Sequence, residues 1–183
     1  RALAEGKSVV IFPESTFTRD PSGWPMKART GVARLALANP DVAVVPVAHW
    51  GNEGLIDPWT GKVSWRKFGR RRTAVDVRIG EPVDLSAYRG RDVTHELLTE
   101  ATEKVMAAVT DELKAIRAAD VAAAAGVSTT AVSFVLNGRD AGNISSATRD
   151  RVLKAAEELD YRPNYVARSL RRNSTSSIGL VTD

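Results

Sequence analysis

Residues 120–137 constrain the fold of this chain more than any other stretch of its sequence. The alanine-rich segment 120–125 predicts a short helix, and Gly126 follows it where a helix ends in a left-handed conformation, which costs glycine no steric penalty. Ser128 is the predicted N-cap of a second helix, because its hydroxyl can accept a hydrogen bond from an otherwise unpaired amide of the next turn. A short helix, a tight turn and a second helix predict a helix-turn-helix.

The predicted second helix has one apolar and one polar face. Val132, Val135 and Leu136 lie at i, i+3 and i+4, so they share a stripe that must face a core. The opposite, exposed face carries Thr129, Thr130, Ser133, Phe134 and Asn137. In a helix-turn-helix that second helix enters the major groove of DNA. The alternative is an alanine-rich pair of amphipathic helices with no DNA role.

The stretch from residue 118 to residue 183 carries four motifs in order: D-V-A-x-x-A-G-V-S, V-S-x-V-L-N-G, T-R-x-R-V-x-x-A and Y-R-P-N-x-x-A-R-S-L. On these motifs it closely resembles the N-terminal headpiece of lactose-repressor-type (LacI/GalR family) transcription factors. The resemblance implies a three-helix head that binds a double-stranded DNA operator. It implies that Thr129, Thr130 and Phe134 occupy the base-reading positions. The neighbours implied to contact phosphates or to cap the helix are Ser128, Ser133 and Asn137.

The same resemblance implies that residues 164–171 form a hinge that becomes helical on DNA. The hinge residues expected at the minor groove are Asn164, Ala167, Arg168 and Leu170. Leu170 would act as a wedge there, with Ala167 packed nearby. Four arginines without an intervening acid also favour phosphate contact by counterion release: Arg162, Arg168, Arg171 and Arg172. A solvated basic linker would have a similar composition.

The composition of the chain indicates its class of protein and the kinds of site it can hold. The chain is 43% hydrophobic and 26% charged, which is ordinary for a soluble globular protein. No apolar run approaches the roughly 18 residues needed to span a bilayer, and because the opening R-A-L-A-E-G-K has no apolar h-region we expect no signal peptide. The lack of cysteine excludes disulfides, and with two histidines we expect no metal site. We expect a cytoplasmic protein, whose net charge of +4 weakly favours an anionic partner.

Predicted strands and helices alternate in the first 116 residues. Strands are predicted at residues 8–12, 42–48 and 74–79, the first two of them buried, and helices at residues 30–39 and 92–116. The predicted fold class is therefore an α/β fragment, a partial sheet with covering helices, followed by an all-α three-helix head with a hinge. We expect the helix at 92–116 to run into, or close to, the first head helix. The expected head core is Val121, Val127, Val132, Val135, Leu136, Val152, Leu153 and Leu159.

A second motif, F-P-E-S-T-F-T-R-D, occupies residues 12–20 and is followed by W-P-M-K, a glycine and V-P-V. Residues 1–116 thereby resemble the C-terminal half of the glycerolipid acyltransferases that convert lysophosphatidate to phosphatidate. In that family an F-P-E-G-T-R block lies on a loop after a strand and helps to hold glycerol phosphate. The resemblance implies this role for Glu14 and Thr16.

Two departures from the F-P-E-G-T-R block affect the implied phosphate contact. Ser15 replaces the glycine and Phe17 replaces the arginine. Arg19 and Lys27 are the cations that could supply the missing charge, because a phosphate needs cations or a helix N-terminus. The alternative is a solvated loop on an unrelated α/β domain.

The acyltransferase family uses a histidine and an aspartate separated by four residues, the histidine acting as general base, and this pair lies upstream of the F-P-E block. No such pair precedes Phe12. His49 has a glycine five positions on, and His95, with Glu100 at the right spacing, opens the long predicted helix. We therefore predict no catalytic residue and no cofactor. Acyl-CoA or acyl-carrier protein would be the donor only if the enzyme were complete.

The run W-R-K-F-G-R-R-R at residues 65–72 has two interpretations. It either contacts anionic lipid headgroups at the inner face of the membrane, with its aromatic residues at the interface, or forms a solvated loop. The residues of the lipid contact would be Trp65, Arg66, Lys67, Phe68, Arg70, Arg71 and Arg72.

The predicted organisation has three parts: an acyltransferase-like region at 1–116, a DNA-binding head with hinge at 117–176, and the start of a truncated ligand-binding domain at 177–183. In the repressor family that last domain carries dimerisation, so a homodimer is expected only when it is restored. We predict sequence-specific DNA binding. The alternatives are a 1-acyl-sn-glycerol-3-phosphate acyltransferase of phospholipid synthesis, truncated at its N-terminus, and an interaction module without chemistry.

Overall fold

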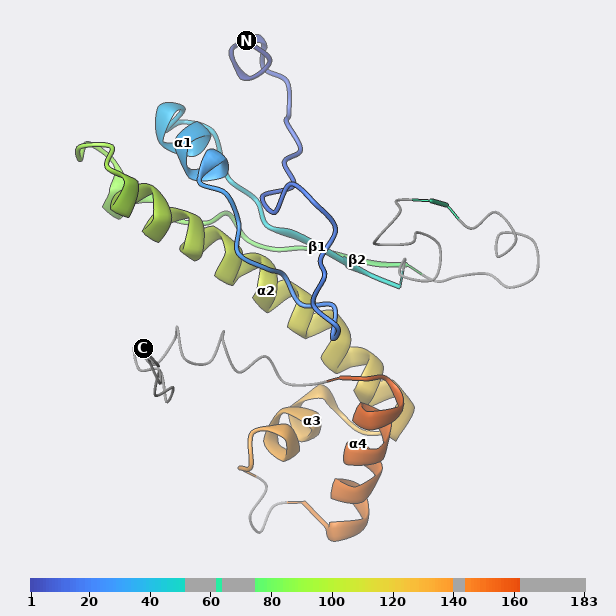
Figure 1. Cartoon of the computed structure of the whole chain (residues 1–183). Coiled ribbons are helices and arrows are strands. Elements are labelled where there is room, and N and C mark those ends of the chain that lie inside the picture. Colours follow the sequence, from blue (N-terminus) through green and yellow to red (C-terminus); the bar gives the residue numbers. More distant parts are fainter. Residues whose placement is uncertain (52–61, 64–74, 140–143, 162–183) are drawn as a thin grey trace, which may run out of the picture.

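The computed structural model describes residues 1–51, 62–63, 75–139 and 144–161. Its elements in chain order are η1 (Leu3–Glu5), α1 (Gly31–Ala38), β1 (Val47–Trp50), β2 (Asp76–Ile79), η3 (Ser86–Tyr88), α2 (His95–Ala125), α3 (Thr129–Leu136) and α4 (Ser146–Glu158). The long helix α2 is the axis of the molecule: α1 and the sheet lie along its first part, and α3 and α4 lie at its other end (Figure 1). The fold is therefore mixed, with a small sheet and a helical rear.

Helix α2 joins the front of the molecule (residues 1–116) to the rear (the head, from residue 117) without interruption. Its N-cap is Thr94, whose side chain accepts a hydrogen bond from the Leu97 amide at 3.2 Å, and its C-cap is Gly126, with φ of 62°. The helix runs straight through the expected boundary at residue 116, so this boundary falls inside a helix. The expectation that the last front helix runs into the first head helix is confirmed.

The front packs a small core against the first half of α2. Its buried members are Val32, Ala33, Leu85, Leu98, Ala101 and Val105. Strands β1 and β2 pair antiparallel, with Val47 opposite Ile79. Ala48 is the β1 side chain buried toward α2, and Arg78 of β2 forms an ion pair with Glu112 of α2. One buried β1 residue and one partly exposed ion pair thus tie this sheet to α2.

The rear has a closed core of three helices. Its buried members are Val121, Ala122 and Ala125 of α2, Val132 and Val135 of α3, and Val152, Ala155 and Ala156 of α4. Val127 and Leu136 pack against them in partly buried positions, as expected. Leu153 and Leu159 were expected in this core, but they are 44% and 42% exposed. That expectation is wrong because the face of α4 that meets the core is made by Val152, Ala155 and Ala156, which leaves the two leucines outside it.

The predicted buried strand at residues 8–12 is not observed. These residues form neither a helix nor a strand, and Val10 is 82% exposed and Phe12 is 72% exposed. The reason is that an apolar run becomes a strand only where a neighbouring strand accepts its backbone hydrogen bonds.

The other two predicted strands form only in part. Of residues 42–48, the last two belong to β1, while the Pro46 carbonyl still accepts a hydrogen bond from Gly80 at 2.9 Å and the Val44 carbonyl accepts one from Val83 at 2.8 Å. Of residues 74–79, the last four form β2, and all four are exposed. Both segments therefore pair, but neither lies in the interior as a buried strand.

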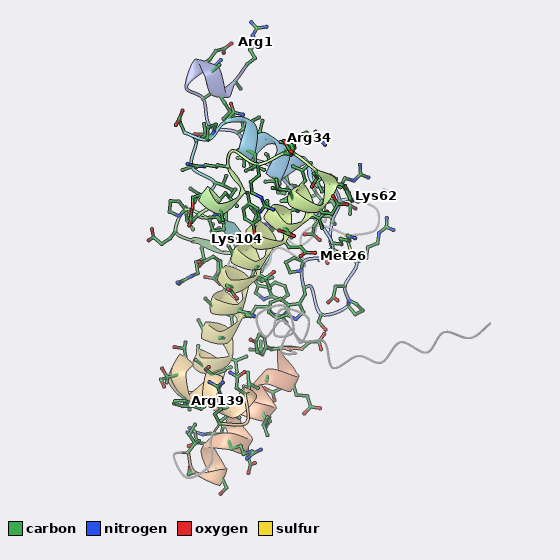
Figure 2. All side chains as sticks on the ribbon, turned by 90° about the vertical axis from the view of Figure 1, so that its left-hand side faces the viewer. Arg1, Met26, Arg34, Lys62, Lys104 and Arg139 are labelled. Atoms are coloured by element: carbon green, nitrogen blue, oxygen red, sulfur yellow. The ribbon has the colours of Figure 1, made fainter. Side chains whose placement is uncertain are left out.

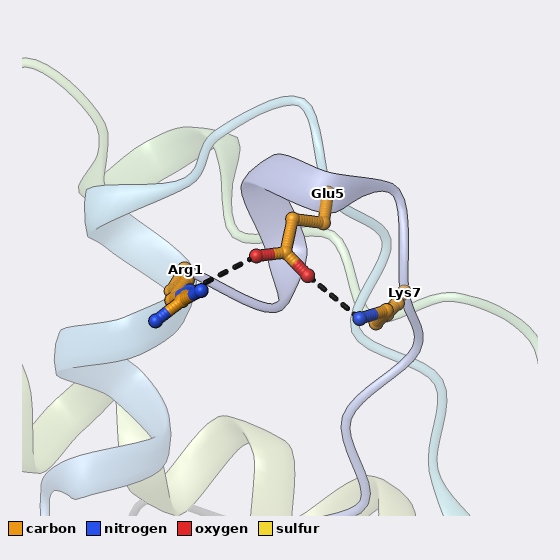
Figure 3. Close-up of polar contacts among 3 residues, drawn as sticks. All are labelled: Arg1, Glu5 and Lys7. Atoms are coloured by element: carbon orange, nitrogen blue, oxygen red, sulfur yellow. Dashed lines mark hydrogen bonds and ion pairs between the residues drawn. The ribbon is translucent and has the colours of Figure 1, made fainter.

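Exposed ion pairs close the N-terminal turn η1. The Glu5 carboxylate accepts from Lys7 Nζ at 2.6 Å and from Arg1 Nε at 3.1 Å (Figure 3). The hydrogen bond from Lys7 has the larger effect and that from Arg1 the smaller, and both lower the pKa of Glu5. Fully exposed pairs of this kind contribute little to stability.

Candidate nucleic-acid interface

Helices α2 and α3 have the geometry of a helix-turn-helix. They are bent by 101° relative to one another, which lies in the range of roughly 90–120° for this motif. The Ser128 hydroxyl accepts a hydrogen bond from the Ala131 amide at 3.2 Å, so the predicted N-cap is confirmed. Gly126, with φ of 62°, occupies the left-handed conformation that the turn requires. The local residues of the turn thus set the angle at which α3 leaves α2.

The two faces of α3 divide as the sequence predicts. Val132 and Val135 are buried in the head core. The exposed side chains are those of Thr129, Thr130, Ser133, Phe134 and Asn137. The structure therefore brings together on one outward face the three residues predicted to read bases and two of those predicted beside them. Their contacts with DNA remain predictions.

The C-terminal end of α3 is held by several hydrogen bonds. Asn137 Nδ2 donates to the Ser133 carbonyl at 2.6 Å, and the Arg139 amide donates to the Phe134 carbonyl at 2.9 Å. The Gly138 amide donates to the Val135 carbonyl at 3.1 Å, with Gly138 at φ of 64°. This pair of backbone bonds is a Schellman motif, which satisfies carbonyls that the helix end would leave unpaired. Asn137 thus has an observed structural role beside its predicted contact with DNA.

Helix α4 closes the head and carries basic side chains on its surface. Its N-cap, Ser145, accepts from the Thr148 amide at 3.2 Å. Arg149 and Arg151 are exposed on α4. Arg139 is exposed just after α3, and Figure 2 shows it in the head, at the opposite end of the molecule from Arg1. The predicted hinge residues Asn164, Ala167, Arg168 and Leu170 lie outside the described residues, as does the basic run at 65–72.

A buried arginine, which no sequence pattern singles out, joins the head to the front. Arg117 of α2 is 2% exposed. Its guanidinium carbon lies 4.8 Å from the ring centroid of Trp24, 4.3 Å from that of Trp50 and 5.1 Å from that of Tyr161. Cation–π contacts of this kind are strongest when they are shielded from water. We call Arg117 and these three rings the junction cluster.

Hydrogen bonds fix the cation of the junction cluster on both sides. Arg117 donates to the Ser22 carbonyl of the front loop at 2.6 Å and to the Asp160 carbonyl, just after α4, at 2.9 Å. Trp24 and Tyr161 meet edge to face, with ring centroids 6.1 Å apart. Burial raises the pKa of the Tyr161 hydroxyl, and the Arg117 charge opposes that shift. Because these partners come from opposite ends of the chain, neither charge nor periodicity could have identified them.

The loop with the F-P-E motif is closed by its own glutamate. The Glu14 carboxylate accepts from the Met26 amide at 2.7 Å, and the Pro13 carbonyl accepts from the Arg29 amide at 2.9 Å. Burial raises the pKa of Glu14, and the hydrogen bond from Met26 opposes that shift. Ser15, at the position of the family's glycine, has φ of 58°, in the left-handed region that favours glycine.

The other predicted phosphate contacts surround this loop. Thr16, Arg19 and Lys27 are exposed. The Arg19 amide contacts the Met26 sulfur at 3.4 Å. Glu14 accepts the hydrogen bond from the amide of Met26, the residue before Lys27. The structure therefore brings these residues into one loop region, while the only Glu14 contact described is with backbone. Their role toward a phosphate remains a prediction.

The two histidines lie on separate elements. His49 is exposed on β1 and pairs with Val77 of β2, whereas His95 is the exposed first residue of α2. Within the described ranges, no group of three or more histidine or carboxylate side chains could hold a metal ion. No single described helix is long and apolar enough to cross a membrane; α2 and α3 meet those conditions only when taken together across their bend.

Comparisons with known proteins match two separate regions. Residues 118–164 match the family of bacterial regulatory proteins of the lacI type, and residues 1–50 match the acyltransferase family. Each match covers a part of the chain, and the first contains all of α3 and α4. The match to the lacI-type family thus falls on the helix-turn-helix described above, from the last part of α2 to the end of α4.

Individual relatives match the same rear region. The transcriptional repressor PurR of Vibrio parahaemolyticus is 52% identical over 62 residues, and the regulator AscG of Escherichia coli is 52% identical over 62 residues. Catabolite control protein A of Streptococcus mutans is 48% identical over 62 residues. Each alignment covers 34% of this chain and 18% of the relative, so the chain spans less than a fifth of the length of these relatives. No solved structure matches the chain significantly.

Proposed function

We propose that this chain binds double-stranded DNA sequence-specifically through α3. The observation that carries the proposal is the outward face of α3, held by a closed three-helix core at a helix-turn-helix angle, within the lacI-type match. Thr129, Thr130 and Phe134 would contact base edges in the major groove. Ser128, Ser133 and Asn137 would contact phosphates or hold the helix end, which positions α3 without reading sequence.

Two further parts of the proposal concern affinity. We expect the hinge residues Asn164, Ala167, Arg168 and Leu170 to order on DNA, with Leu170 as the minor-groove wedge. Phosphate contacts by the basic residues make binding strongly salt-dependent.

We also propose that one chain reads one half-site and that a homodimer requires the ligand-binding domain. We further propose that the protein is cytoplasmic.

A binding-site selection from random duplexes tests this function. Wild-type protein should enrich one sequence motif, and the double variant Thr129→Ala, Thr130→Ala should lose the enrichment while retaining salt-dependent binding. Thr99→Ala is the matched control, because Thr99 lies in the front half of α2 and its hydroxyl donates to the His95 carbonyl of the same helix. Failure of wild-type protein to enrich any motif would reject sequence-specific binding.

The second candidate function, 1-acyl-glycerol-3-phosphate acyltransferase, is favoured by the family match of residues 1–50. We propose that this region does not transfer acyl groups and needs no cofactor. The support is that Glu14 is engaged by a backbone amide and that His49 and His95 are exposed on different elements.

An acyl-transfer assay tests that proposal. Purified chain with acyl-coenzyme A and lysophosphatidate should show no turnover above background. Turnover that is abolished by His49→Ala or by His95→Ala would overturn the proposal and restore the enzymatic alternative.

A further inference from the structure

One side chain on the outward face of α3 differs chemically from its neighbours. Phe134 is 39% exposed, whereas the residues around it on that face carry hydroxyl or amide groups. Phe134 does not belong to the head core, nor to the partly buried residues that pack against it. The fold of the head therefore does not explain why an aromatic ring stands at this position.

The chemistry of the major groove supplies a partner for this ring. Phenylalanine has no hydrogen-bond donor or acceptor, so it cannot make the paired contacts that arginine makes to guanine or asparagine to adenine. The apolar feature that base edges present in the groove is the C5-methyl group of thymine. 5-Methylcytosine carries the same methyl group at the same ring position. A pyrimidine methyl is thus the partner that an exposed ring on α3 can recognise.

A neighbouring residue and the helix end both favour such a contact. Thr130 lies four positions before Phe134, so the two side chains are neighbours on the same exposed face. The threonine adds a methyl group and a hydroxyl beside the ring. The Phe134 carbonyl accepts from the Arg139 amide at 2.9 Å, so the backbone that carries the ring is fixed by the Schellman motif before DNA binds.

We infer that Phe134 selects a pyrimidine carrying a 5-methyl group at one position of the half-site. This inference rests on the proposed DNA-binding function and adds the chemical group that α3 reads. Van der Waals contact between the ring and the methyl group removes apolar surface of both from water. Loss of the methyl group should weaken binding by about four-fold, the size expected for the removal of one buried carbon group.

The experiment uses the duplex enriched by the full chain and replaces each thymine in turn with deoxyuridine, which removes only the methyl group. Anisotropy titrations with wild-type protein should show the loss of about four-fold at one position per half-site. In a second arm, cytosine and 5-methylcytosine at that same position are compared, and the methylated base should bind more tightly by a similar factor.

Variants assign the methyl effect to the ring. Phe134→Ala should bind the thymine and deoxyuridine duplexes equally, while Phe134→Leu should retain part of the preference. Thr99→Ala, in the front half of α2, is the control and should retain the full preference. Because Phe134 lies outside the core, the circular dichroism and the melting temperature of Phe134→Ala should match wild type; if that variant misfolds, Phe134→Leu carries the comparison.

The outcomes distinguish failure of this inference from failure of the proposed DNA-binding function. If a motif is enriched but neither methyl group changes the affinity, or if Phe134→Ala keeps the preference, this inference is wrong while the DNA-binding function stands. If only the cytosine pair responds, methylated cytosine is the source of the recognised group. If no motif is enriched, the proposed function itself fails.

Discussion

The front and the head both pack on α2, but they differ in how completely they bury their apolar residues. In the head, Val121, Val132 and Val152 are fully buried among three helices. In the front, Val77 and Ile79 of β2 are 62% and 70% exposed. A helix makes its backbone hydrogen bonds internally, whereas a strand needs neighbours, and a sheet of two strands is marginal alone. The comparison teaches that the end of α2 and two shorter helices close a core where two strands do not.

The largest expected effect is at the junction cluster, where the two regions meet. Arg117→Ala should lower the free energy of unfolding by about 2–4 kcal/mol, because the Ser22 and Asp160 carbonyls lose their donor and the space between three rings is vacated. The front should then melt before the head. Thermal melts followed by tryptophan fluorescence and by far-ultraviolet circular dichroism should coincide in wild type and separate in the variant.

Arg34→Ala is the control for that experiment, because Arg34 is exposed on α1. It should leave both melting curves unchanged. Coincident and unshifted melts for Arg117→Ala would show that the junction cluster does not couple the two regions.

The next effect compares one substitution in the two regions. Val132→Thr should destabilise the head by about 2 kcal/mol, because it places a hydroxyl in a fully buried site. Val77→Thr should change stability by less than about 0.5 kcal/mol, because that side chain is 62% exposed. Urea unfolding measures both variants. Equal losses would mean that the exposed face of β2 is covered in solution.

A smaller effect distinguishes helix caps in the two regions. Ser128→Ala should destabilise the head by about 1 kcal/mol, because it removes the hydrogen bond from the Ala131 amide. Thr30→Ala in the front is the matched control, since Thr30 precedes α1 without a side-chain capping bond. Chemical denaturation measures the free energy of unfolding of both variants. If Thr30→Ala lowered it as much as Ser128→Ala does, the expected difference between the two caps would be contradicted.

The smallest expected effect is on the pH dependence of stability, through Glu14 in the loop with the F-P-E motif. Burial raises the pKa of Glu14, so the folded state favours its protonated form. The stability contributed by Glu14 is therefore present below the unfolded pKa and is lost as the pH rises through the higher folded pKa. Glu14→Gln should remove this decline in a pH series of urea melts.

Glu5→Gln is a control of opposite sign, because hydrogen bonds from Lys7 and Arg1 lower the pKa of Glu5. Any stability from Glu5 is present above its unfolded pKa and is lost as the pH falls through the lower folded pKa. A Glu14→Gln profile identical to wild type would show that the burial of this carboxyl does not matter to the fold.

Sequence alone determined the turn between α2 and α3 and the two faces of α3, because the signals for them are local. Ser128 caps α3 three residues before its donor, Gly126 ends α2 by its own backbone freedom, and the spacing of Val132 and Val135 decides which face is buried. The same spacing leaves Phe134 and its neighbours exposed. Each of these relations spans four residues or fewer, so periodicity and capping rules are sufficient to predict them.

Tertiary structure decided the rest, because the partners lie far apart in the chain. The apolar run at residues 8–12 predicts a strand, but no described strand pairs with it and it stays exposed. Arg117 is an ordinary surface cation by sequence, yet a hydrogen bond to Ser22 and another to Asp160 hold it inside the junction cluster. Strand pairing and the burial of a cation depend on which distant residues arrive beside them, and only the folded chain brings those residues together.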